Sequence, residues 1–200
     1  MKITIMVEGK TERAFKSHLH EFLKGRMAGR DMPKLDFFPC DGRVYKEAKL
    51  QRTVKMLLQS DSAAVIALTD VYTGTKDFSD AADAKQKMQE WVGDEPKFYP
   101  HAAQYDFEAW LLPYWSDIQR LAGHNRTAPS GAPEKVNHNR PPSRHIIEIF
   151  EIGTCRDSYS KVRDANAILR GKDLAVAAAQ CPELKAFLNT ILTLAGGDTL

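Results

Sequence analysis

KITIMVEGKTE, residues 2–12, sets the fold of this chain. Residues 3–7 are apolar or β-branched, which is typical of a buried strand. The polar run Glu8-Gly9-Lys10-Thr11 interrupts that pattern, and apolar residues then recur at helical spacing, at positions 15, 19, 22 and 23. The segment therefore predicts a strand, a tight turn and a helix, in that order.

The same alternation continues to residue 104. Further strands are predicted at 34–40, 63–69 and 97–104, and helices at 45–60 and 78–92, the second with Ser79 or Asp80 as its N-cap. Residues 63–69 (AAVIALT) are apolar without alternation, as a strand covered on both faces requires. Strands that alternate with helices connect by right-handed crossovers and form parallel sheets. The predicted fold class is α/β, a mostly parallel Rossmann-like sheet with helices on both faces.

The alternation ends near residue 115. Residues 122–142 are rich in Gly, Pro, Asn and Ser, which predicts a loop. Helices are predicted at 143–151, 158–170 and 182–195, the last opened by Pro182 and closed by Gly196-Gly197. We expect an α/β core over residues 1–115 and a C-terminal helical extension over 116–200, packed together as one continuous domain.

Composition excludes a disordered or fibrous chain, because 43% of the 200 residues are hydrophobic. The formal net charge is only +2, so no uniform field attracts a polyanion. Residues 116–172 carry 10 basic and 6 acidic side chains, whereas residues 1–115 carry 17 of each. Two interpretations remain open for this excess: a solvated helical surface, or a basic face of Arg140, Arg144, Lys161 and Arg163 that holds nucleic acid.

Cysteine use and hydropathy bear on the compartment. Cys40, Cys155 and Cys181 are far apart and form no C-x-x-C pair, which favours reduced thiols and a cytoplasmic protein. No apolar run approaches the length of a spanning helix, so neither secretion nor a membrane partner is expected.

Carboxylates follow three of the predicted strands. Glu8, Asp70 and the pair Asp106 and Glu108 come at strand ends, where ligands of open parallel sheets gather. Carboxylates that meet at one edge need a cation, and oxygen ligands suit Mg²⁺ or Mn²⁺. The alternative is that Glu8 favours the N-terminus of the first helix and that Asp70 is a turn residue. If residues 106–108 are helical, the two acids diverge by about 200° and only one faces the site.

Several segments carry a resemblance to a known family. Glu8-Gly9-Lys10-Thr11-Glu12 resembles the E-G-x-T-E opening of Toprim-like proteins, the topoisomerase–primase domain shared with overcoming-lysogenization-type nucleases. The later segments resemble an uncharacterised bacterial Toprim-like family that is encoded beside an AAA- or ABC-type ATPase in phage-defence contexts. They are Asp70-Val71-Tyr72, Asp77-Phe78, the run 105–112 (YDFEAWLL), Pro133-Glu134, Asn137, Pro142-Ser143-Arg144 and Cys181-Pro182.

The resemblance implies roles for the acids. Glu8 is expected to act in proton transfer or metal binding at a phosphodiester, and Asp70 matches the first acid of the second motif. Tyr72 stands where the broader D-x-D pattern has its second acid, and a phenol is a poor Mg²⁺ ligand at neutral pH. The missing carboxylate is then supplied by Asp106 or Glu108, and the family's acidic-Phe-Glu motif favours Glu108.

Four basic residues are candidates for phosphate binding. Arg144 and His145 follow Ser143, which we expect to cap a helix, so two cations are predicted beside free backbone N–H groups. Lys161 is expected to extend that patch, and Lys10 follows the first strand. A surface helix start with incidental charges is the alternative.

Two functions of different classes follow. The first is an Mg²⁺- or Mn²⁺-dependent nuclease, the effector of a defence module gated by an ATPase partner, with Glu8, Asp70 and Glu108 as catalytic residues. The second is a non-catalytic subunit that binds an ATPase partner or a nucleotide, which Tyr72 favours. Since the chain has no G-x-x-x-x-G-K-[ST] loop, it is not expected to hydrolyse ATP itself. The sequence leaves the nucleic-acid substrate and a homo-oligomer open.

Overall fold

The computed structural model describes residues 1–27, 29–40, 42–72, 76–137 and 140–200, without the side chains of residues 10–14. Four parallel strands form one sheet in the order β2-β1-β3-β4. Their bounds are β1 Lys2–Val7, β2 Lys34–Pro39, β3 Ala64–Asp70 and β4 Phe98–Ala103. The predicted α/β class is confirmed, and each strand lies within two residues of its predicted bounds.

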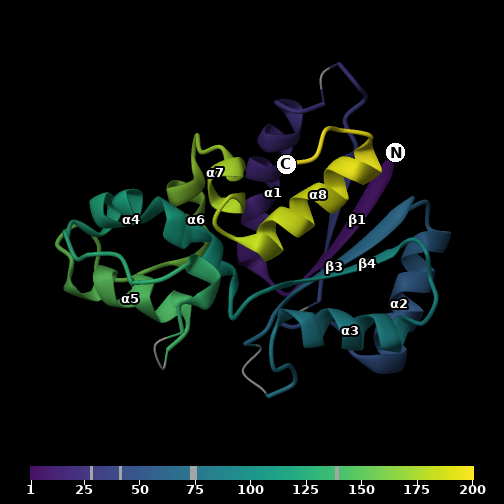
Figure 1. Ribbon diagram of the computed structural model, residues 1–200, viewed down its shortest axis with the longest axis horizontal. Helices are drawn as coiled ribbons and strands as arrows, with labels where there is room; N and C mark the ends of the chain where they lie inside the picture. The colour runs from purple at the N-terminus through teal and green to yellow at the C-terminus, as the bar shows by residue number, and fades with distance from the viewer. Residues whose placement is uncertain (28, 41, 73–75, 138–139) are drawn as a thin grey trace.

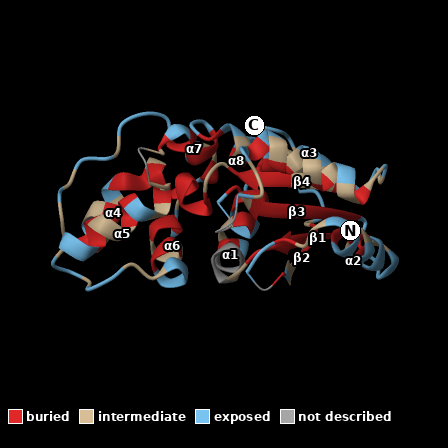
Figure 2. Ribbon diagram, turned by 90° about the horizontal axis from the view of Figure 1, so that it is seen from below, coloured by how far each residue is buried: buried red, intermediate tan, exposed pale blue. Residues whose placement is uncertain are grey.

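Helices lie on both faces of the sheet (Figure 1), and alternate residues of the strands belong to two different hydrophobic clusters. Ile3, Ile5 and Ile66 pack toward α1 (Lys10–Lys24) and α8 (Pro182–Ala195), whereas Met6 and Val65 pack toward α2 (Glu47–Gln59) and α3 (Ala81–Val92). Both faces of the sheet are therefore covered, and the two central strands β1 and β3 are buried along almost their whole length (Figure 2), whereas the edge strand β2 is only partly buried. As expected, Asp80 caps α3, because its side chain accepts a hydrogen bond from Asp83 N at 2.8 Å.

The C-terminal part of the chain is helical. The bounds of its elements are η1 Phe107–Tyr114, α4 Trp115–Ala122, η2 Pro133–Lys135, α5 Pro142–Ile152, α6 Lys161–Leu169 and α7 Leu174–Ala178. Helices α4, α5 and α6 gather beyond the carboxyl ends of the strands, on the side of the molecule opposite α2 (Figure 1). We did not predict α4, α7 or the 3-10 helices from the sequence.

Element η1 joins the sheet layer to the helical extension. Trp110 is buried at its centre, with ring centroids 5.5 Å from Phe107 and 6.0 Å from Phe187 of α8. One hydrophobic cluster consequently runs from β1 through η1 into α5 and α6. Among the described residues, no helix combines the length and the apolar character that crossing a bilayer takes.

Candidate active site

The site begins where the strand order changes direction. From β1 the chain crosses over to β2 on one side and later returns to β3 on the other, so β1 and β3 flank a topological switch point. Open parallel sheets bind ligands in the crevice outside the carboxyl ends of the strands at such a point. Glu8 directly follows β1, and Asp70 is the last residue of β3.

Glu8 is held against the end of β3. Its Oε1 accepts a hydrogen bond from Asp70 N at 3.0 Å and another from the Thr69 hydroxyl. The Glu8 side chain is buried, with 7% of its surface exposed. The backbone of Asp70 therefore lies at the Glu8 carboxylate.

Asp106 and Glu108 both belong to the same neighbourhood. Tyr105 has a φ of 68°, and Asp106 is extended (φ −143°, ψ 165°), so the chain turns after β4 before η1 begins at Phe107. Since Asp106 precedes the helix rather than lying within it, the predicted 200° divergence from Glu108 does not apply. Burial, followed by the charge of Glu108, raises the pKa of Asp106 to about 7. The condition under which only one of these acids was expected to face the site, a helix over both residues, is therefore not met.

Lys161, the first residue of α6, joins the acids into one cluster. Its Nζ lies 3.3 Å from Oε1 of Glu108, which is fully buried. Burial of the Lys161 ammonium lowers its pKa, but the charges of Glu108, Asp70 and Asp106 outweigh that effect and raise the pKa. The hydroxyl of Tyr159 donates to the same Glu108 Oε1 at 3.4 Å. We call Glu8, Asp70, Asp106 and Glu108 the acidic cluster.

Helix α5 contributes a backbone donor to this cluster. Ser143 N donates to Asp106 Oδ2 at 3.1 Å. The predicted N-cap role of Ser143 is wrong, because α5 begins at Pro142 with Pro141 in the cap position. The N–H group that we expected to hold an external anion therefore binds a carboxylate of the protein.

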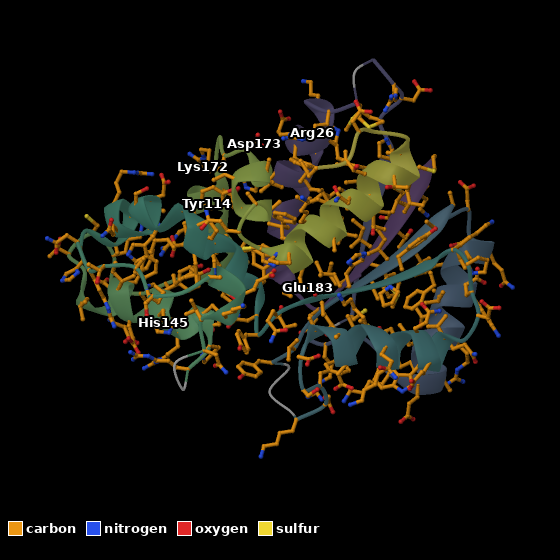
Figure 3. All side chains as sticks on the ribbon, in the orientation of Figure 1. Arg26, Tyr114, His145, Lys172, Asp173 and Glu183 are labelled. Atoms are coloured by element: carbon orange, nitrogen blue, oxygen red, sulfur yellow. The ribbon has the colours of Figure 1, made fainter. Side chains whose placement is uncertain are left out.

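Arg144 and His145 point to different surroundings. The Arg144 guanidinium lies 3.9 Å from Glu148 and 3.8 Å from Glu151, and half of the side chain is exposed. His145 is buried and lies in the helical extension (Figure 3), where it lines a cavity of about 260 Å³ together with Arg126 and Arg140. The Arg144 guanidinium thus lies near acids of its own helix, whereas His145 lines the cavity.

The arginines expected beside the acidic edge, Arg140 and Arg163, form ion pairs. Arg140 binds Glu148, which also binds Arg126 at 3.1 Å. Arg163 binds the buried Asp164 at 2.9 Å. Of the four cations that we expected beside the acidic edge, Lys161 alone has a described contact with the acidic cluster. The side chain of Lys10, the remaining phosphate-binding candidate, lies outside the described residues.

Tyr72 stands at the edge of the site. Its side chain is 42% exposed, its ring centroid lies 5.2 Å from that of Tyr105, and its hydroxyl accepts a hydrogen bond from Asn137 Nδ2 at 2.6 Å. The residue in the position of the second D-x-D acid therefore links the end of β3 to the segment after η2.

The sequence matches a known family from residue 7 to residue 192, described as a domain of unknown function (DUF4276). The chain belongs to the DUF4276 family. A search of curated proteins gave no match. The fold is similar to that of the C-terminal region of the Burkholderia pseudomallei OLD protein, with a TM-score of 0.56 and 14% identity, over 97% of this chain and 98% of that one. At this identity the two share the fold alone.

Glu134 of this DUF4276 chain is a buried acid that we did not assign to any role. Its Oε1 accepts a hydrogen bond from Trp110 Nε1 at 2.9 Å, and Oε2 accepts one from Glu183 N at 3.0 Å. Glu183 lies in the first turn of α8 (Figure 3), so the Glu134 carboxylate caps that helix. Hydrogen bonds from the start of α8 to Glu134 therefore join two segments of the family resemblance, Pro133-Glu134 and Cys181-Pro182. Pro182 at the first helical position marked the start of a helix, and the free N–H groups of a helix start need a hydrogen-bond acceptor.

The acids of this DUF4276 chain offer oxygen donors, the kind of ligand that a hard divalent cation takes. All four acids offer carboxylate oxygens, and Asp106 Oδ1 is buried with no hydrogen-bond partner among the described residues. Over the described part of the chain, however, no three His, Cys, Asp or Glu side chains lie close enough together to hold a metal ion. In this arrangement the Lys161 ammonium balances part of the carboxylate charge.

Proposed function

We propose that this chain is an Mg²⁺- or Mn²⁺-dependent nuclease that hydrolyses phosphodiester bonds in nucleic acid. The observation that supports it most is that the Glu8 carboxylate is hydrogen-bonded to the end of β3, while the charges of Asp70, Asp106 and Glu108 all act on Lys161. The resemblance of Glu8-Gly9-Lys10-Thr11-Glu12 to the Toprim opening supports the same chemistry. The fold shared with the C-terminal region of an OLD protein is consistent with it.

The acidic cluster would hold the cation. Glu8, Asp70, Asp106 and Glu108 are the proposed ligands, and a divalent cation bound by them supplies a Lewis acid for the scissile phosphate. We assign to Glu8 the role of holding or moving a proton, and the Thr69 hydroxyl and Asp70 N fix its Oε1. Lys161 lies beside the same carboxylates and offers a cation to a phosphate oxygen. Arg144, His145 and Lys10 remain proposed phosphate contacts.

The proposed nuclease acts as the effector of a defence module with an AAA- or ABC-type ATPase partner. This part rests on the sequence resemblance and on the absence of a phosphate-binding loop in the chain. The test measures cleavage of plasmid and RNA by the chain with Mg²⁺ or Mn²⁺, with and without the ATPase encoded beside it. We expect cleavage that needs both metal and partner and is lost in Glu8→Gln but kept in Lys55→Gln, an exposed control. Vigorous cleavage by the chain alone contradicts the gating.

A non-catalytic subunit is the second candidate. Tyr72 favours it, because its hydroxyl bonds Asn137 at 2.6 Å and offers no carboxylate to a cation. Tyr72→Asp adds one oxygen ligand and should raise Mn²⁺ affinity if the acidic cluster binds metal, whereas Tyr72→Phe should leave it unchanged. Metal-independent behaviour of the wild type and both variants, with intact binding to the partner, would favour the non-catalytic subunit.

A further inference from the structure

A second feature lies at the carboxyl edge of the sheet, beside the acidic cluster. The loop after β2 and the first turn of α2 form an open pocket of about 400 Å³. It is lined by Cys40, Arg43, Val44, Tyr45, Lys46 and Lys49, and we call it the β2 pocket. None of these residues belongs to the site described above.

The β2 pocket is cationic. Three of its six lining residues are basic, and none is acidic. Arg43 and Lys49 are exposed, and among the described residues neither forms an ion pair. The Lys49 ammonium lies 3.7 Å from the centroid of the Tyr45 ring, which holds it at the pocket. Lys46 binds Asp77 at 2.5 Å, so the pocket keeps a net positive charge when Asp77 is counted.

Backbone hydrogen bonds join the β2 pocket to the acidic cluster. Cys40 N donates to Val7 O at 2.8 Å, and Gly42 N donates to Glu8 O at 2.7 Å. The pocket loop is therefore bonded to the residue that begins the candidate site. Lys46 continues this connection to the segment after β3 through its pair with Asp77.

A nucleic acid that binds at the acidic cluster requires positive charges close by, and the β2 pocket carries such charges. A phosphodiester that approaches four carboxylates is repelled unless cations lie close by, and phosphate contacts from Lys and Arg supply most of the sequence-independent affinity for nucleic acid. The arginines Arg126, Arg140 and Arg163 are held by Glu148 and Asp164. Arg43 and Lys49 line the pocket whose loop is bonded to Glu8 through Gly42, and neither forms an ion pair with a carboxylate among the described residues.

We propose that the β2 pocket binds backbone phosphates of a polynucleotide strand next to the bond that the acidic cluster cleaves. The pocket is open and larger than one phosphate, and its cations are spread over a loop and a helical turn, which suits successive phosphates of a strand. Since the inference rests on the proposed nuclease function for its orientation, its test measures binding without cleavage.

The experiment follows binding of a fluorescent single-stranded oligonucleotide to the full chain in EDTA, by anisotropy at several salt concentrations. Arg43→Gln with Lys49→Gln should weaken binding at least tenfold and lower the slope of log K against log salt by about 1.4, because two phosphate contacts are lost. The matched control, Arg52→Gln with Lys55→Gln, removes two exposed charges from α2 outside the pocket and should change neither quantity. Equal losses in both double variants, or no loss in the first, overturn the proposal.

Competition identifies the ligand class. An unlabelled oligonucleotide should displace the probe at far lower concentration than inorganic phosphate or a mononucleotide, and polyglutamate of equal charge should compete poorly. Equal competition by polyglutamate or by a mononucleotide overturns the assignment to a polynucleotide strand. If the pocket variant loses binding but the chain shows no metal-dependent cleavage, the proposed nuclease function is wrong and the proposed phosphate-binding pocket is supported. If Glu8→Gln abolishes cleavage while the pocket variant binds normally, the nuclease function is supported and the pocket proposal is wrong.

Discussion

Asp70 N donates a hydrogen bond to Oε1 of Glu8 at 3.0 Å, so the end of β3 holds the carboxylate that follows β1. The Thr69 hydroxyl donates to the same oxygen. Two donors on one buried oxygen fix the Glu8 rotamer before any ligand arrives. The Asp70 carboxylate adds a second negative charge to this end of the sheet, and a bound cation would offset it.

Substitution of Glu8 separates its hydrogen bonds from its charge. Glu8→Ala removes the acceptor of two buried donors and should lower the free energy of unfolding by about 1–3 kcal/mol. Glu8→Gln keeps an acceptor oxygen and removes the repulsion with Asp70, so it should be at least as stable as the wild type. Urea unfolding at pH 7.5 without metal measures both. Equal destabilisation by the two variants would refute this account of Glu8.

Lys161 balances Glu108 in the metal-free chain. Lys161→Met should lower the free energy of unfolding by about 1–2 kcal/mol, less than for a fully buried pair, because half of the Lys161 side chain is exposed. Glu108→Gln in the same chain should recover part of that loss. A double-mutant cycle by urea unfolding gives the coupling, and strictly additive effects would show that the two residues do not interact.

Glu134 should be structural. Glu134→Ala leaves Trp110 Nε1 and the first N–H groups of α8 without their acceptor, and we expect a loss of about 2–4 kcal/mol in urea unfolding. Glu151→Ala, in an exposed position, is the control. Since Glu134 contacts no member of the acidic cluster among the described residues, Mn²⁺ affinity should stay unchanged in the folded variant; a large change in affinity would place Glu134 in the site.

His101 gives the fold a pH dependence. Burial, followed by the charge of Lys85, lowers the pKa of His101 from 6.5 to about 4, and its Nε2 lies 3.0 Å from the Thr190 hydroxyl. A base whose folded pKa is lowered contributes stability that is complete above pH 6.5 and is lost as the pH falls toward 4. His101→Gln should flatten the dependence of unfolding free energy on pH between 7 and 4.5, whereas His20→Gln, on an exposed residue, should not. An unchanged slope in His101→Gln would contradict this assignment.

The sheet could be predicted from the sequence because its strands are short apolar runs with clear polar ends. Residues 63–69 show this best, since a short apolar run without alternation that ends in polar residues is typical of a strand covered on both faces. Asp70 was expected after that strand and is its last residue, a shift of one position that leaves its side chain at the carboxyl edge. Helix α8 was also predictable, because Pro182 and Gly196 mark its ends.

The sequence was enough to predict which acids follow the strands, but not how their side chains are arranged in space. Asp106 and Glu108 share one neighbourhood because Tyr105 turns the backbone at a positive φ, which a Tyr gives no reason to expect. The charge excess of residues 116–172 drew attention to arginines that pair with Glu148 and Asp164. The cations of the β2 pocket lie in a half of the chain whose charge sums to zero, so only the fold reveals them.

Binding of Mn²⁺ to the full chain, measured as the loss of the free-ion electron paramagnetic resonance signal at pH 7.5, tests the central claim most directly. The wild type should bind the ion. Glu8→Gln should bind it at least tenfold more weakly, and Glu21→Gln, an exposed carboxylate on α1, should bind it as the wild type does. No binding by the wild type, or equal binding by the wild type and Glu8→Gln, would contradict the claim that the acidic cluster is a metal site.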